Sequence, residues 1–309
     1  MRSVPLRGVC LLVVLPLLGL TVACGGRPGA EAGRVLAAQR GPAPPASRPA
    51  TTAARPAPKP KPKPKKPRTT KRPTPPVSGD LLRKAAAGME PGTTLGAAVF
   101  DRVTGKSPLE YNADRGFRSA SLVKLLIAID VLERGAGVAD RQRVARMLTM
   151  SDDGLASMFW VRDGGPELVT HLSAELGLSG VRPPEVPGRW GEVVVTPHDV
   201  VAVYRYVLRL PPPDRALIVT ALGQAPRVAA DGFDQHFGIP DGLDAQWAVK
   251  QGWGSNDRAR VLHSTGLVGP GFRYVVVLLT EHPLGSGWPA CARSLTAAAS
   301  ALHGTMPGL

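Results

Sequence analysis

The 309-residue sequence has few cysteines, and its histidines form no metal-binding pattern. Three cysteines (Cys10, Cys24 and Cys291) are too few for a disulfide framework or a cysteine-rich metal site. The six histidines show neither an H-E-x-x-H pattern nor a close pair. We therefore expect no metal ion and no other cofactor.

Acidic residues are almost absent from the first quarter of the chain. Residues 1–77 contain 15 of the 38 lysines and arginines but a single acid, Glu31, whereas residues 78–309 contain 23 basic and 23 acidic residues. Nucleic-acid binding by the later part is disfavoured, because that part has no excess of positive charge. Its apolar content instead supports one core of roughly 230 residues.

Residues 1–23 have the pattern of an export signal. Two arginines precede an apolar stretch over residues 9–20, which is shorter than the roughly 20 residues that span a bilayer. Cys24 follows a small residue, as in a bacterial lipobox, where the cysteine is lipidated and becomes the mature N-terminus. Thr21 stands where a lipobox usually has leucine, so an ordinary signal peptide with a chance cysteine is the alternative. We expect a lipid-anchored protein at the extracellular face of the cell membrane.

Residues 24–78 are predicted to be a disordered linker. Fourteen prolines lie between Arg27 and Val77, and residues 59–67 are lysines and prolines, largely in alternation. Proline lacks a backbone N–H and fixes φ, and neighbouring lysines repel one another, so neither helix nor strand is expected. The segment is either a solvated spacer or a spacer whose cations also contact anionic lipid headgroups or cell-wall polymers.

The remaining residues, 79–309, are predicted to form one domain with strands at both ends and helices between them. The expected strands cover residues 94–101, 109–112, 245–249, 260–268 and 272–281. The expected helices cover residues 80–89, 122–133, 140–150, 155–161, 166–176, 197–210, 214–222 and 289–302. Asp80 is expected near the cap of the first helix. This order predicts one sheet built from both ends of the domain, with the helical middle forming a second lobe.

Residues 121–124 form the S-x-x-K pattern Ser-Leu-Val-Lys at the start of an apolar helix. A helix that is apolar on nearly every side is a buried helix, and burial lowers the pKa of a lysine such as Lys124. Ser121 lies one turn back on the same face, where free backbone N–H groups favour a developing negative charge. A nucleophile, a base and an oxyanion donor would thus meet. The alternative is that Ser121 caps the helix and Lys124 extends to water.

Two later segments strengthen the catalytic interpretation. Ser151-Asp152-Asp153 lies between two expected helices, and Lys250-Gln251-Gly252 lies on a late strand. In this order the three segments resemble the S-x-x-K, S-D-N and K-T-G motifs of class A β-lactamases and penicillin-binding proteins. The resemblance covers residues 79–309. It implies an α+β fold, with an antiparallel sheet flanked by helices plus a small all-helical lobe.

The resemblance also implies a role for each matching residue. Ser121 would be the nucleophile, and Lys124 the base. Ser151 would relay a proton to the leaving nitrogen, and Lys250 would attract the substrate carboxylate. The backbone N–H groups of Ser121 and Trp253 would form the oxyanion hole. The further substrate-binding positions that it implies are Asp153, Gln251 and Gly252.

The sequence departs from the family pattern at two of these positions and in one loop. Asp153 stands where the family has asparagine, so an amide donor is lost, and Gln251 replaces a threonine or serine whose hydroxyl helps to hold the substrate carboxylate. Class A enzymes also carry an E-x-x-L-N segment whose glutamate activates the deacylating water. Between residues 178 and 196 the only carboxylates are Glu185 and Glu192, and neither stands in that pattern. Deacylation is therefore expected to be slow.

Two functions follow from these observations. The first is a monomeric serine hydrolase that forms an acyl-serine with β-lactams or peptidoglycan-type peptides. The second is a catalytically degenerate lipoprotein on the same fold, used for cell-wall binding or sensing. The departures at Asp153 and Gln251 favour the second function, and the retained Ser–Lys pattern favours the first.

Overall fold

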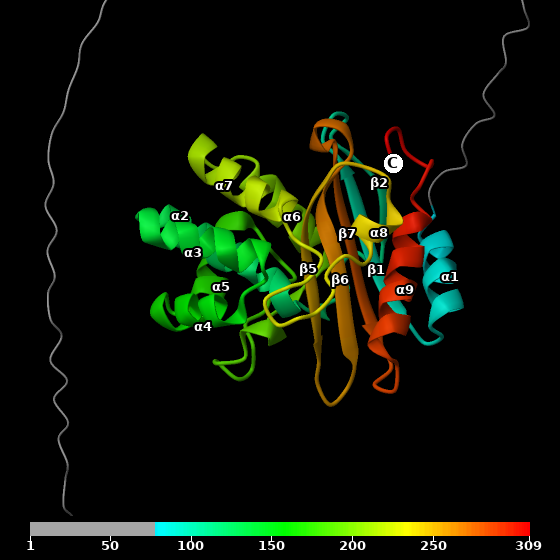
Figure 1. Cartoon of the computed structure of the whole chain (residues 1–309), viewed down its shortest axis with the longest axis horizontal. Coiled ribbons are helices and arrows are strands. Elements are labelled where there is room, and N and C mark those ends of the chain that lie inside the picture. Colours follow the sequence, from blue (N-terminus) through cyan, green and yellow to red (C-terminus); the bar gives the residue numbers. More distant parts are fainter. Residues whose placement is uncertain (1–77) are drawn as a thin grey trace, which may run out of the picture. The chain divides into compact units, whose positions relative to one another are not determined.

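The computed structural model describes residues 78–309 of the chain (Figure 1). The expected export signal, the expected lipidation site at Cys24 and the expected linker lie outside the described residues. Within residues 78–309, no helix is both long enough and apolar enough to cross a membrane.

A five-stranded antiparallel sheet runs through the described part, in the order β2-β1-β7-β6-β5 (Figure 1). Strands from both ends of the domain pair at its centre, where β1 lies against β7. The strands are β1 (Thr94–Asp101), β2 (Lys106–Tyr111), β5 (Trp247–Ser255), β6 (Arg260–Val268) and β7 (Tyr274–His282). The predicted sheet built from both ends is confirmed.

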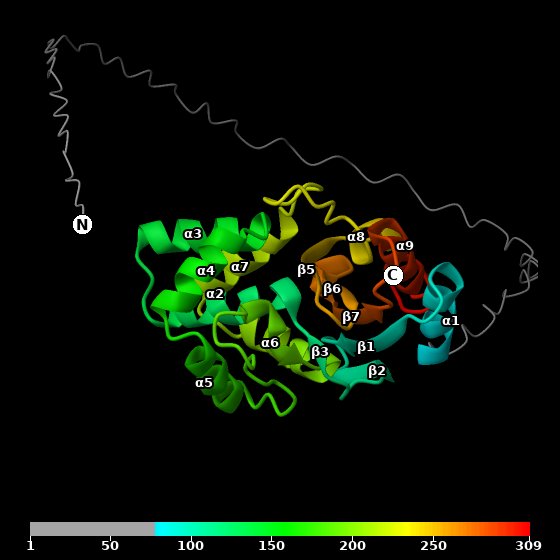
Figure 2. The same cartoon turned by 90° about the horizontal axis from the view of Figure 1, so that it is seen from below.

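Helices cover both faces of the sheet, and each face has its own apolar core (Figure 2). Val275 and Val277 of β7 belong to the core shared with the helical lobe, whereas Val276 and Leu278 belong to the core under α1 and α9. Side chains alternate along a strand, so a continuous apolar run is what a strand covered on both faces needs. The helices are α1 (Gly79–Met89), α2 (Lys124–Glu133), α3 (Val138–Thr149), α4 (Asp153–Arg162), α5 (Pro166–Leu176), α6 (Pro197–Val207), α7 (Pro212–Gly223), α8 (Ile239–Gly242) and α9 (Trp288–Ser300).

Asp80 lies near the cap of α1, as expected: it is in the first turn, and its backbone N–H donates to the hydroxyl of the N-cap Ser78 at 3.2 Å. Two predicted elements differ from the structure for local reasons. The helix expected over residues 122–133 is divided into a 3₁₀ turn, η1 (Ala120–Val123), and the helix α2. Strand β5 continues beyond residue 249, because β6 pairs with it along its whole length.

Several short elements were not predicted from the sequence. A two-stranded ladder joins β3 (Phe117–Arg118) to β4 (Val194–Val195) beside the start of η1. The others are the helix α8 and the 3₁₀ turns η2 (Trp190–Glu192) and η3 (Pro270–Phe272). Elements of two to four residues are too short to show a hydrophobic period, and the β3–β4 pairing joins residues far apart in the sequence.

Candidate active site

Ser121 lies in the turn η1, immediately before the buried helix α2. Ala120, the residue before it, has a φ of 44°, in the left-handed region that non-glycine residues rarely adopt. The turn packs closely on β5 at Gly252, where a Cβ atom would lie 3.0 Å from the Ser119 carbonyl oxygen. The close approach therefore depends on a glycine at position 252, and it fixes Ser121 against the strand.

Lys124 is the first residue of α2, and its side chain is fully buried. Its Nζ donates to Ser121 Oγ at 2.8 Å and to the Ser151 carbonyl oxygen at 2.8 Å, and it lies 3.2 Å from Ser151 Oγ. It also forms an ion pair with Asp153, with 2.5 Å between Nζ and Oδ1. The indole of Trp190 lies 4.9 Å from Nζ, a cation–π contact. The predicted S-x-x-K lysine thus contacts both candidate serines directly.

Ser151 joins two buried lysines through one hydroxyl group. It lies between α3 and α4 with a φ of 53°, again in the left-handed region. The Nζ of Lys250 donates to Ser151 Oγ at 2.9 Å and to the Gln251 carbonyl oxygen at 2.9 Å. Strained backbone of this kind persists only where surrounding contacts hold it, and it is concentrated at functional sites.

Burial changes the protonation of both lysines. Desolvation lowers the pKa of Lys124, and the negative charge of Asp153 opposes that change. Desolvation also lowers the pKa of Lys250, to well below its usual value, and the positive charge of Lys124 lowers it further. Two ammonium groups are therefore disfavoured around Ser151, because each would be desolvated and repelled by the other. The lowered pKa values favour the neutral amine at both positions, and more strongly at Lys250.

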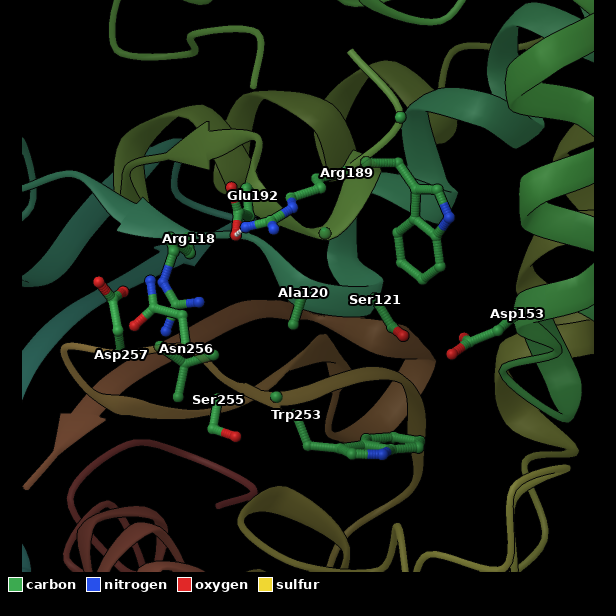
Figure 3. Close-up of a pocket in the computed structure, with 15 residues that line it drawn as sticks. Arg118, Ala120, Ser121, Asp153, Arg189, Glu192, Trp253, Ser255, Asn256 and Asp257 are labelled. Carbon is green, nitrogen blue, oxygen red and sulfur yellow. Dashed lines mark hydrogen bonds and ion pairs between the residues drawn. The ribbon is translucent and has the colours of Figure 1, made fainter. Parts of the chain in front are cut away.

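The cluster opens onto a groove with a volume of about 680 Å³ (Figure 3). Ser121 lies between Asp153 on one side and Arg118, Asn256 and Asp257 on the other (Figure 3). Two indoles from distant parts of the chain also line the groove, and each is held by a hydrogen bond. The Nε1 of Trp190 donates to Ser157 Oγ at 3.1 Å, and the Nε1 of Trp253 donates to Asp231 Oδ2 at 2.9 Å.

Of the sequence-predicted residues, Ser121 and Asp153 line the groove, whereas Lys124, Ser151 and Lys250 are buried and are joined to it through hydrogen bonds. Ser121, Lys124, Ser151, Asp153 and Lys250 form one continuous set of hydrogen bonds and ion pairs. Gly252 lies under this set as a packing position, and Trp253 forms part of the groove wall.

Gln251 is the predicted residue that the structure directs elsewhere. Its side chain is buried, and its amide donates to the carbonyl oxygens of Gln235 at 3.0 Å and Phe237 at 2.6 Å. Gln251 thus holds the segment before α8 against β5 and does not line the groove. The predicted contact between Gln251 and the substrate is not supported by these hydrogen bonds.

Sequence reasoning missed several residues that line the groove. Arg118 is brought there by β3, which pairs with a strand 76 residues later in the chain. Two further residues line the groove from η2: Glu192, which the sequence analysis named only as a loop carboxylate outside the family pattern, and Trp190. No spacing in the sequence marks these positions, because each depends on the path of the loop and not on a helical or strand period.

The comparisons with known proteins agree with this architecture. No family model matches the sequence. The chain is 38% identical over 204 residues to the protein named "Putative lipoprotein LppW" of Mycobacterium tuberculosis and of Mycobacterium bovis. That alignment covers 62% of this chain and 64% of the relative. The chain thus matches just under two thirds of the length of these curated relatives.

Solved structures of two kinds share the fold. A mutant of PBP-A, determined as an acyl-enzyme complex with penicillin G, matches 74% of this chain and 97% of its own with a TM-score of 0.57 and 19% identity. The β-lactamase of Streptomyces albus G matches 72% of this chain and 98% of its own with a TM-score of 0.55 and 22% identity. The chain is therefore homologous to LppW, and its described part has the α+β fold of class A β-lactamases and PBP-A.

Proposed function

We propose that this protein is a serine hydrolase that forms an acyl-serine with β-lactams or peptidoglycan-type peptides and deacylates slowly. The observation that carries the proposal is the hydrogen-bonded chain Ser121–Lys124–Ser151–Lys250, whose first member lines an open groove. A serine beside a buried lysine is an activated nucleophile, because the neutral amine can take the hydroxyl proton.

Acylation begins with Ser121. Its Oγ attacks the substrate carbonyl carbon, and its proton passes to the neutral Nζ of Lys124 over the 2.8 Å hydrogen bond. The developing oxyanion is assigned to the backbone N–H groups of Ser121 and Trp253, the role that the resemblance implies for them. Each such donor contributes most when it is fixed before the reaction, and η1 is fixed by its close packing on β5.

Departure of the leaving group requires a proton on the nitrogen. The Ser151 hydroxyl supplies it as the C–N bond breaks, and the Lys124 ammonium returns a proton to Ser151 across 3.2 Å. Lys124 is then neutral again and Ser151 is again a hydroxyl, so the net result is transfer of one proton from Ser121 to the leaving nitrogen. Lys250 holds the Ser151 hydroxyl at 2.9 Å. Attraction of a substrate carboxylate, the role that the resemblance implies for Lys250, would need its protonated form, which burial and the charge of Lys124 disfavour.

Slow deacylation is proposed because neither of the two loop carboxylates, Glu185 and Glu192, is placed as a base for the deacylating water. Glu192 lies in the wall of the groove, but its Oε1 is 3.3 Å from the guanidinium of Arg189. The Glu192 carboxylate is thus engaged with Arg189, and Glu185 lines the second hollow and not the groove that contains Ser121. Loss of one positioned general base costs about 10²–10⁴ in rate.

A catalytically degenerate lipoprotein for wall binding or sensing is the second candidate. It is favoured by the ion pair between Lys124 and Asp153, which stabilises the protonated lysine, and by the orientation of Gln251 away from the groove. In either case we propose a monomer that is held at the outer face of the membrane through a lipidated Cys24.

Labelling with a fluorescent penicillin tests the proposal. The wild-type protein is expected to form a covalent adduct that survives denaturing electrophoresis, and Ser121→Ala is expected to form none. Ser255→Ala is the matched control, because Ser255 lines the same groove but is exposed and makes no contact with Lys124. Absence of labelling of the wild-type protein at any penicillin concentration would favour the degenerate lipoprotein.

A further inference from the structure

The groove continues past Ser121 into a second hollow with a volume of about 570 Å³. Five residues line both spaces, so the two form one continuous channel along the surface: Arg118, Arg189, Glu192, Asn256 and Asp257. The second hollow adds Arg182 and Arg258 to the arginines of the first. Four guanidinium groups therefore line a space that begins beside the candidate nucleophile.

Three of these arginines, which we call the arginine subsite, form no ion pair with a carboxylate in residues 78–309: Arg118, Arg182 and Arg258. The carboxylates in the hollow are Glu185, Glu192 and Asp257. Only Glu192 is paired there, with Arg189 at 3.3 Å. The guanidinium groups of the arginine subsite are thus open to a further anion.

Arg118 is the member nearest the reaction centre, three residues before Ser121. It is half-buried on β3, and its Nη2 donates to the Ala259 carbonyl oxygen at 3.0 Å. Desolvation lowers the pKa of its guanidinium, and the charges of Glu192, Glu281 and Asp257 oppose that change. The remaining N–H donors of a rigid guanidinium suit a carboxylate in a bidentate arrangement.

The direction of a bound substrate follows from the proton relay. The leaving nitrogen must face Ser151, on the side of Ser121 where Asp153 lies (Figure 3). The acyl part must then extend to the other side, along the end of β5 toward Asn256 and Arg118 (Figure 3). An acyl chain several bonds long would bring its far end to the arginine subsite.

We propose that the arginine subsite binds a carboxylate on the acyl part of the substrate, so that the preferred acyl donors are anionic at both ends. This inference rests on the proposed function, because it takes the direction of the substrate from the acylation chemistry. The substrate class is a peptide-like acyl donor with a side-chain or terminal carboxylate several bonds from the reacting carbonyl.

Two penicillins that differ in one charge test the proposal. Both are 6-aminopenicillanic acid acylated with adipic acid, one with a free chain carboxylate and the other with that carboxylate as a methyl ester. Competition with a fluorescent penicillin gives their second-order acylation rates. The free acid is expected to react about tenfold faster or more, since charged hydrogen bonds are the strong ones. The preference should fall with added salt.

Variants assign the effect to the subsite. Arg118→Gln combined with Arg258→Gln is expected to abolish the preference for the free acid over the methyl ester, a ratio that is measured within each protein and does not depend on its basal rate. Arg83→Gln is the control, because this arginine lies on α1 and is paired with Asp80. Equal rates for the two penicillins with the wild-type protein would overturn the proposal.

The Ser121→Ala protein, which cannot be acylated, distinguishes a failure of the arginine subsite from a failure of the proposed acylation. Titration calorimetry with the same two compounds then measures non-covalent binding alone. Tighter binding of the free acid, lost in the double arginine variant, supports the arginine subsite even if the wild-type protein is never acylated. Equal binding of both compounds, or binding of neither, overturns it.

Discussion

At the scale of single residues, Asp153 has the largest influence on the base. Its exposed carboxylate lies in the groove and is 2.5 Å from the Nζ of the fully buried Lys124. Burial favours the neutral amine, whereas Asp153 favours the ammonium. In the proposed mechanism, the carboxylate therefore raises the pH above which Lys124 could accept the proton of Ser121.

Asp153→Asn is expected to shift the acid limb of the acylation profile to lower pH. The substitution removes the negative charge that raises the pKa of Lys124, whereas burial still lowers it. The pKa of Lys124 therefore falls, and the neutral amine is present at lower pH. The second-order rate of acylation by a fluorescent penicillin, measured from pH 5 to 9, provides the profile. Lys124→Arg is the control and is expected to abolish acylation throughout, because a guanidinium stays protonated. A shift to higher pH in Asp153→Asn would contradict this account.

The residues that could be predicted are those whose position follows from local geometry. Ser121 and Lys124 meet because three residues make almost one helical turn, and this contact was visible in the spacing alone. Gln251 was assigned by its place in a motif, but its orientation is set by the carbonyl groups of Gln235 and Phe237. Arg118 was missed because a long-range strand pairing places it.

At the scale of elements, the site depends on how η1 packs on β5. Any side chain larger than that of glycine would crowd position 252, because a Cβ would be 3.0 Å from the Ser119 carbonyl oxygen and 3.4 Å from the Leu122 side chain. Buried strands and helices were predictable from long apolar runs. The 3₁₀ turn was not, since it arises from this contact and from the left-handed conformation of Ala120.

Gly252→Ala is expected to destabilise the fold by about 1–3 kcal/mol through overpacking and to slow acylation. The added methyl group pushes η1 away from β5 and displaces Ser121 relative to the backbone of the strand. Thermal unfolding and the rate of penicillin labelling measure the two effects. Gly254→Ala is the matched control, because the nearest atom to its Cβ would be the Ala120 side chain at 4.0 Å. Equal effects of the two substitutions would show that the close approach is unimportant.

At the scale of the whole molecule, charge and fold are separated along the sequence. The net charge of +14 belongs to residues 1–77, and the residues that form the sheet and its helices are balanced. The α+β fold could be predicted because strands occur at both ends of the domain and helices between them. The proposal of a lipid anchor rests on residues outside the described part and on the likeness to a protein named as a lipoprotein.

Cys24→Ala is expected to move the protein from the membrane fraction to the medium. Acyl chains hold a protein on a bilayer far more tightly than a basic segment does, and salt weakens only the basic segment. Fractionation at low and high salt, followed by immunoblotting, measures the distribution. Cys10→Ser is the control, since Cys10 lies within the expected signal and should not affect the anchor. Unchanged membrane association of Cys24→Ala at both salt concentrations would refute lipidation.

In the proposed function, the Ser121–Lys124–Ser151 cluster acylates rapidly and no well-placed base releases the acyl group. Rapid mixing with a chromogenic cephalosporin separates these two steps, because it records acylation and turnover in one trace. We expect a burst of about one equivalent per protein, absent in Ser121→Ala, followed by a phase slower by about 10²–10⁴. Fast linear turnover without a burst would contradict this expectation and would identify Glu185, Glu192 or another group as an efficient deacylating base.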